Sequence, residues 1–161
     1  MTLYLEDLVV GTVSELGQRS VSAEEIVAFA REFDPQPFHL DPEAARRSPF
    51  GGLVASGWHV SSIFGRLIVD GLFDEVANLA GLGLDEVRFL APVRPGDTLS
   101  GWATIIATRV SQSRPGTGIV TFRCVLANQD GVDVWSATCT CLVRRRPDGT
   151  QDVSRNGLGA P

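Results

Sequence analysis

The chain has 161 residues and a mass of 17.3 kDa, the size of one ordinary domain with its own hydrophobic core. Hydrophobic residues make up 43% of it and charged residues 20%, which argues against a wholly disordered chain. A formal net charge of -5 argues against a nucleic-acid-binding protein, which normally carries a basic face. No stretch approaches the ~20 apolar residues of a membrane span, and the acidic start does not fit a secretion signal. We therefore expect a soluble, cytoplasmic protein without nucleic-acid or membrane partners.

The chain contains three cysteines, Cys124, Cys139 and Cys141. An odd number without framework spacing is not typical of a secreted, disulfide-linked domain. No Cys or His cluster has the spacing of a zinc site. We expect reduced cysteines in the core, with Cys139 and Cys141 on one face of a strand, and no metal or redox site built from them.

The first predicted helix begins at Ser22. Glu25 follows three residues later, which is the capping-box pattern. The helix should end at Asp34, because the proline after it disfavours helical backbone in the residue before. The segment 35–42 contains three prolines and is expected to be irregular, and a short helix should carry residues 43–47.

A second, longer helix is predicted from Ser56, a plausible N-cap, to Leu72. Its apolar residues recur at the spacing of one helix face. Further along the chain the apolar period changes to two, which is typical of strands with one buried face. The predicted strands are residues 84–90, 98–110, 120–126 and 135–143.

Helices early in the chain and consecutive antiparallel strands late in it predict an α+β domain. We expect the sheet to curl around the long helix, within a folded unit of residues 3–145. Residues 146–161 contain almost no apolar side chain and are predicted to form a flexible tail. The three arginines at 144–146 are expected to be a solvated strand end.

One short segment contains residues that could carry chemistry. Asp34 and His39 are a carboxylate and an imidazole five residues apart on a loop with two prolines between them. Prolines stiffen a loop, and general acid–base chemistry requires titratable groups at a fixed distance. On spacing alone this signal is weak, and a turn-capping Asp34 with a partly buried, structural His39 is the favoured interpretation.

The wider sequence resembles the MaoC-like dehydratase family, the (R)-specific enoyl-CoA hydratases of the hot-dog fold. The family motif reads roughly Asp-x-Asn-Pro-x-His, and Asp34, Pro37 and His39 match it, with Gln36 at the Asn position. Three further segments are similar in the same order: YLEDLVVG near the start, FGGLVASGWHVSS before and into the long helix, and VRFLAPVRPGDTL after it.

The resemblance implies a hot-dog fold: a curled antiparallel sheet wrapped around a long central helix. It also implies reversible addition of water to a 2-enoyl thioester of coenzyme A or an acyl carrier protein, without a cofactor. By resemblance Asp34 and His39 are the catalytic pair. Asp34 is then the expected base toward water, with His39 orienting the water and sharing proton transfer. Hot-dog relatives pair edge to edge, so a homodimer or higher homo-oligomer is expected.

The resemblance also implies three substrate-binding positions. The Gly57 N–H at the start of the long helix would meet the thioester oxygen, where a helix N-terminus offers free N–H groups. Ser62 matches a helix serine near the pair, although a serine bonding back to its own helix is the alternative. Gln36 would orient the pair through its amide. Ser56 departs from the family, in which many members have His before the Gly.

Two other functions remain open from the sequence. A hot-dog thioesterase would also use a carboxylate and a helix N-terminus, but it has no need of the Asp34–His39 pair. A non-catalytic subunit that binds acyl-CoA would retain the fold without the reaction. The substitutions at Gln36 and Ser56 are compatible with such a subunit.

Overall fold

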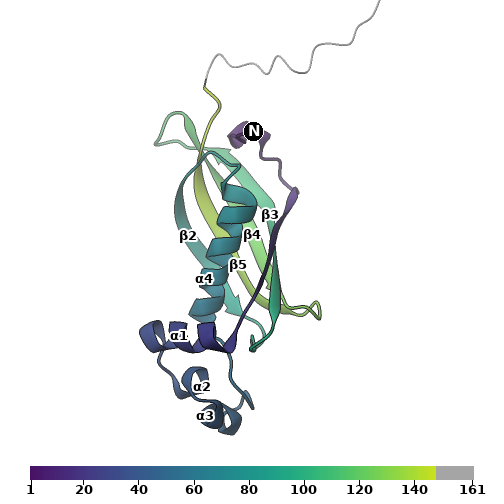
Figure 1. The fold of residues 1–161 in the computed structure, drawn as a ribbon. Coiled ribbons are helices and arrows are strands. Elements are labelled where there is room, and N and C mark those ends of the chain that lie inside the picture. Colours follow the sequence, from purple (N-terminus) through teal and green to yellow (C-terminus); the bar gives the residue numbers. More distant parts are fainter. Residues whose placement is uncertain (148–161) are drawn as a thin grey trace, which may run out of the picture.

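The computed structural model describes residues 1–147 (Figure 1). These residues form five strands, which are β1 (Val13–Ser20), β2 (Asn78–Phe89), β3 (Thr98–Val110), β4 (Thr117–Ala127) and β5 (Asp133–Arg144). The helical segments are η1 (Leu5–Asp7), α1 (Ala23–Phe33), α2 (Pro37–Leu40), α3 (Pro42–Arg47), α4 (Gly57–Ile68) and η2 (Val69–Phe73). The strands form one sheet in the order β1-β3-β4-β5-β2, and every neighbouring pair is antiparallel.

The core lies between the sheet and α4. Figure 1 shows α4 lying along the concave side of the curled sheet, with α1, α2 and α3 gathered at one end. The apolar face of α4 packs on the inward side chains of β3, β4 and β5, and the Phe64 ring stacks on Trp135 at a centroid distance of 4.5 Å. The three cysteines are free and buried in this core, as predicted. A curled antiparallel sheet around a central helix is the predicted hot-dog arrangement, and it is confirmed.

The strongly periodic segments were the best predicted. Ser22 caps α1 with the expected capping box, in which its side chain accepts from the Glu25 N–H. Ser56 caps α4 by accepting from the Trp58 N–H. The long helix continues from Ile68 into the π-helical turn η2, so its end agrees with the predicted Leu72 to within one residue. The strands β3, β4 and β5 lie where expected.

Three expectations were wrong at the local level. Residues 37–40, expected to be irregular, form the helical turn α2, because a proline at the first helical position is compatible with helix. The strand predicted from Leu84 begins six residues earlier, at Asn78. Strand β1 was not predicted at all. It buries only Leu16, so its sequence shows no clean alternation.

The N-terminal turn and the end of β5 are joined by ion pairs. The Arg146 guanidinium donates to both carboxylate oxygens of Asp7, at 2.6 and 2.7 Å, and Arg145 donates to Glu6 at 3.0 Å. Arg145 and Arg146 therefore hold η1 in place, which corrects the expectation of a solvated strand end. The rest of the predicted tail, residues 148–161, lies outside the described residues.

Both edges of the sheet carry exposed side chains, and β2 is the more apolar. On β2, Leu79, Leu82, Leu84 and Phe89 are each at least 40% exposed. The pairing of β2 with β5 is interrupted at three places, and Glu86 has a positive φ of 52° beside the last of them. Among residues 1–147, no helix is long and apolar enough to cross a membrane.

Candidate active site

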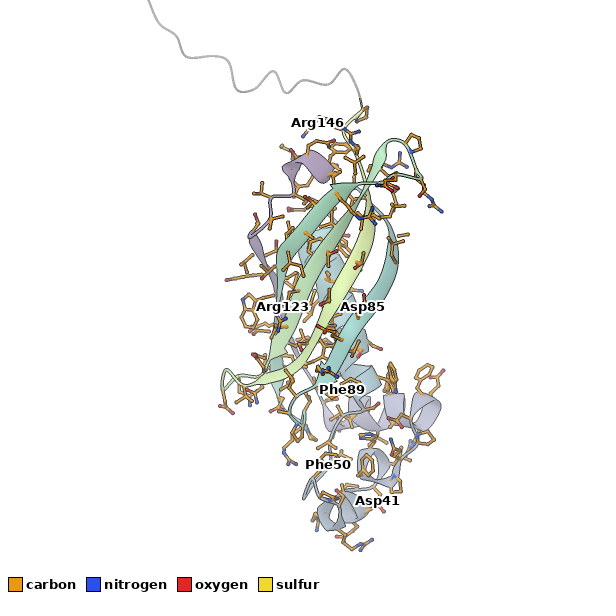
Figure 2. The ribbon with its side chains drawn as sticks, turned by 180° about the vertical axis from the view of Figure 1, so that it is seen from behind. Asp41, Phe50, Asp85, Phe89, Arg123 and Arg146 are labelled. Carbon is orange, nitrogen blue, oxygen red and sulfur yellow. The ribbon has the colours of Figure 1, made fainter. Side chains whose placement is uncertain are left out.

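A cavity of about 500 Å³ opens at the end of the molecule where α1, α2 and the start of α4 meet the end of β2. Asp34 and His39 are the only titratable side chains among the described residues that line it. Most of the rest of its wall is apolar, and four aromatic residues contribute: Phe38, Phe50, Trp58 and Phe89. Figure 2 shows Phe89 and Phe50 toward this end of the molecule, and Arg146 at the opposite end.

Asp34 is held at the cavity by neutral donors. It is the C-cap of α1, and its Oδ1 accepts from the Gln36 amide at 2.8 Å. Its Oδ2 accepts from the Ser56 hydroxyl at 2.6 Å. The hydrogen bond from Ser56 lowers the pKa of Asp34 from its ordinary value. Burial opposes this shift, whereas the hydrogen bond from Gln36 and the nearby His39 add to it. Asp34 is therefore a carboxylate at neutral pH.

His39 approaches the same carboxylate from α2. Its side chain is buried, and its Nδ1 lies 2.7 Å from the Val54 carbonyl oxygen. A carbonyl only accepts, so Nδ1 carries a proton. In the neutral imidazole, Nε2 is then a free acceptor, and it lies 3.4 Å from Asp34 Oδ2. Two acceptor atoms thus lie 3.4 Å apart, and a donor placed beside both of them would satisfy both.

Gly57 brings the N-terminus of α4 to the same cavity. Its N–H belongs to the first helical turn, so the helix offers it no acceptor. No other described residue accepts from it either. A Cβ at this position would lie 2.6 Å from atoms of the Phe89 ring, so glycine is what lets that ring lie over the helix start. A free N–H and the positive end of a 12-residue helix can together stabilise a developing negative charge.

The structure brings four of the five residues expected from the sequence to the cavity: Asp34, Gln36, His39 and Gly57. It does not bring Ser62 there. Ser62 is exposed and donates to the Trp58 carbonyl one turn back in α4, the alternative considered for it.

Two residues near the site were not expected from the sequence to take part. Ser56 was expected as a helix cap and as a departure from the family's His, and its hydroxyl also contacts Asp34. Ser61, next to Ser62, accepts from the Trp135 indole N–H at 2.9 Å and so ties α4 to β5. Among residues 1–147, no group of three or more His, Cys, Asp or Glu side chains is placed to hold a metal ion.

Comparison with known families matches residues 9–123 to the MaoC like domain. The chain belongs to the MaoC-like family. A MaoC-like dehydratase from Rhodospirillum rubrum has a crystal structure that superposes with a TM-score of 0.84 and 48% identity, covering 90% of this chain and 99% of that one. The uncharacterized protein YdeM of Bacillus subtilis is 32% identical over 89% of this chain and all of its own length.

An (R)-hydratase from A. caviae involved in PHA biosynthesis is a more distant structural match. It superposes with a TM-score of 0.67 and 26% identity, covering 88% of this chain and 99% of that one. The MaoC-like family therefore includes both hydratases and dehydratases, and the present chain has their fold.

Proposed function

We propose that this MaoC-like protein is a hydro-lyase that adds water reversibly to a 2-enoyl thioester and gives the (R)-3-hydroxyacyl thioester. The observation that carries the proposal is the pair of acceptors, Asp34 Oδ2 and His39 Nε2, 3.4 Å apart in the cavity wall. A water molecule can donate one hydrogen to each of them. Its oxygen then directs a lone pair toward the cavity, where the conjugated double bond would lie.

The thioester oxygen needs stabilisation as the reaction proceeds. Addition of water at the β-carbon moves electrons through the double bond onto that oxygen and produces an enolate. The free N–H of Gly57 and the helix dipole of α4 would stabilise the enolate charge. Asp34, His39 and Gly57 would then act together on one substrate, with Gln36 fixing the Asp34 carboxylate.

The lining of the cavity favours an uncharged acyl group. Among the described residues the lining contains no Lys or Arg, and Asp34 contributes a negative charge. A second carboxylate on the acyl chain would lose its hydration there without gaining a partner. We therefore propose an apolar acyl chain, with coenzyme A or an acyl carrier protein as the thiol component.

A homodimer would cover the apolar edge of the sheet. Strand β2 presents unpaired backbone groups beside exposed leucines, and such an edge needs cover. Phe89 at the end of β2 also lines the cavity, so a second copy paired at this edge would lie close to the site. A symmetric dimer formed through β2 is the assembly we propose.

The test is a comparison of two substrates. Loss of the absorbance of the conjugated thioester of crotonyl-CoA reports hydration, and thiol release from a saturated acyl-CoA reports hydrolysis. We expect hydration without hydrolysis, and dehydration of (R)- but not (S)-3-hydroxybutyryl-CoA. Hydrolysis of the saturated thioester would instead indicate a thioesterase. Binding without either reaction would indicate a non-catalytic acyl-CoA-binding subunit.

A further inference from the structure

Ser56 connects the backbone of α4 to the Asp34 carboxylate through a single hydroxyl. Its side chain is fully buried. The Trp58 N–H lies 3.2 Å from Ser56 Oγ, and Oγ lies 2.6 Å from Asp34 Oδ2. A backbone N–H can only donate, so Oγ accepts from Trp58 and gives its one proton to Asp34. The direction of this short chain of hydrogen bonds is fixed by the fold.

The two oxygens of Asp34 thus each accept a hydrogen bond from a protein group, Ser56 on Oδ2 and Gln36 on Oδ1. Both bonds favour the carboxylate over the carboxylic acid. His39 differs, because its Nδ1–H is directed at the Val54 carbonyl and its Nε2 accepts from no described residue. His39 Nε2 therefore has a lone pair that no described residue occupies, whereas each Asp34 oxygen already accepts a hydrogen bond.

We propose that Ser56 is a positioning residue that keeps Asp34 an ionised acceptor and leaves proton transfer to His39 Nε2. This inference rests on the proposed hydratase function and deepens it. The family resemblance makes Asp34 the expected base toward water, whereas the hydrogen bonds favour the reverse roles. Asp34 then holds the water by one hydrogen, and its negative charge stabilises the imidazolium that forms.

The proposed proton transfer balances without any further reactant. Nε2 takes a proton from water as the water oxygen bonds to the β-carbon, and the electrons of the double bond move to the thioester oxygen. The enolate then collapses, and the α-carbon takes the proton from the imidazolium Nε2–H. One imidazole thus moves a single proton, and His39 returns to its starting state.

The experiment compares variants at Ser56. Ser56→Ala and Ser56→Gly both remove the hydroxyl, but glycine is nearly as good a helix N-cap as serine, so loss of the cap and loss of the proton donor are separated. Ser56→Thr keeps the hydroxyl. Ser22→Ala is the matched control, because Ser22 also caps a helix, α1, through its hydroxyl and does not contact Asp34.

Two readouts distinguish a positioning role from a structural one. The first is the titration of the Asp34 carboxyl followed by carbon-13 NMR, and the second is kcat and KM for crotonyl-CoA. In Ser56→Ala and Ser56→Gly we expect Asp34 to titrate at higher pH, and kcat to fall at least tenfold with KM within about threefold. Ser56→Thr should restore most of both, and Ser22→Ala should change neither.

An unchanged Asp34 titration in both hydroxyl-free variants would overturn the role of Ser56, whatever happens to thermal stability. A kcat within twofold of the wild type in Ser56→Gly would overturn it as well. The titration does not depend on turnover. If the wild-type protein proved not to hydrate enoyl thioesters, the effect of Ser56 on Asp34 would still be measured, and the two failures remain distinguishable.

Discussion

The molecule holds a carboxylate in two different ways at its two ends. Asp7 at the N-terminal end forms a two-point ion pair with Arg146, and both side chains are about a quarter exposed. Asp34 at the cavity end has no Arg partner among residues 1–147 and accepts from a hydroxyl and an amide instead. Neutral donors keep Asp34 ionised without neutralising it, which leaves its charge available to a reacting group. The ion pair of Asp7 joins the N-terminal turn to the residues that follow β5.

The largest expected effect is that of Asp34→Asn, and Asp7→Asn is the matched substitution at the other end of the molecule. Asp34→Asn keeps the shape but loses the charge that would stabilise a protonated His39, so turnover of crotonyl-CoA should fall by about 100-fold or more. Asp7→Asn should leave turnover unchanged and lower the free energy of unfolding by about 1 kcal/mol at most. Steady-state kinetics and urea unfolding of both variants check this contrast.

The second member of the proposed catalytic pair is tested by His39→Ala. It should lose at least as much turnover as Asp34→Asn, and the double variant should be far from additive because both groups act on one water. If either single variant remains folded and hydrates the substrate at a near-normal rate, the catalytic pair is assigned wrongly.

The edge strand β2 runs between the two ends and gives the next largest effect. Leu84 is 43% exposed on β2, whereas Val13 is 58% exposed on β1 at the opposite edge. We expect sedimentation of the wild type at about twice 17.3 kDa at micromolar concentration. Leu84→Lys should shift the protein toward monomer, because a charge at a sheet edge opposes pairing, and Val13→Lys should not. A wild type that sediments as a monomer would contradict the β2 interface.

Two glycines of the long helical segment, Gly57 and Gly71, are expected to respond differently to substitution by alanine. A Cβ at Gly71 would lie 2.5 Å from Leu16 Cα in the backbone of β1, which cannot give way easily. Gly71→Ala should therefore lower the free energy of unfolding by about 1–3 kcal/mol with little change in turnover per folded molecule. At Gly57 the obstacle is the Phe89 ring, which is 54% exposed and can swing aside.

For Gly57→Ala we expect the opposite pattern. Stability should change little, while kcat/KM falls by about tenfold, less than the 10²–10³ that follows removal of an oxyanion donor. The double variant Gly57→Ala/Phe89→Ala tells the two causes apart. If the displaced ring is responsible, the second substitution recovers activity, and if the added methyl itself blocks the N–H, it does not. An equal loss of stability in Gly57→Ala and Gly71→Ala would show that the two positions do not differ.

Sequence patterns predicted the elements that bury one continuous face. Helix α4 and strands β3 to β5 repeat their apolar residues at a fixed period over ten or more residues, and packing follows that period. Strand β1 was missed because Leu16 is its only buried residue. The pair Asp34 and His39 was found through a short local motif. The contact of Ser56 with Asp34 was not, because 22 residues separate them and only the tertiary fold brings them together.

The smallest expected effect concerns the second histidine, His59, which lies in α4 between two residues of the cavity wall, Trp58 and Val60. His59 is 7% exposed, its ring stacks on Phe29 at 4.8 Å, and its Nδ1 has no partner among the described residues. Burial lowers the pKa of His59 from its ordinary 6.5, with Glu25 opposing and Arg19 adding to the effect. Below pH 6.5 His59 becomes protonated in the unfolded chain more readily than in the folded chain, so stability is lost as the pH falls.

His59→Phe keeps the stacking on Phe29 and removes both the unpaired nitrogen and the titration. At pH 8 we expect a gain of about 1 kcal/mol in the free energy of unfolding, because an unsatisfied buried polar atom is destabilising. At pH 5 the gain should be larger, because protonation of His59 in the unfolded chain destabilises the folded wild type and cannot occur in the variant. Urea midpoints of both proteins at the two pH values measure the difference. If the difference in the free energy of unfolding between variant and wild type is the same at pH 5 and pH 8, the loss of stability in acid does not arise from His59. The carboxyl groups of Asp34 and Glu25, whose pKa values are lowered in the folded chain, are then the groups to test.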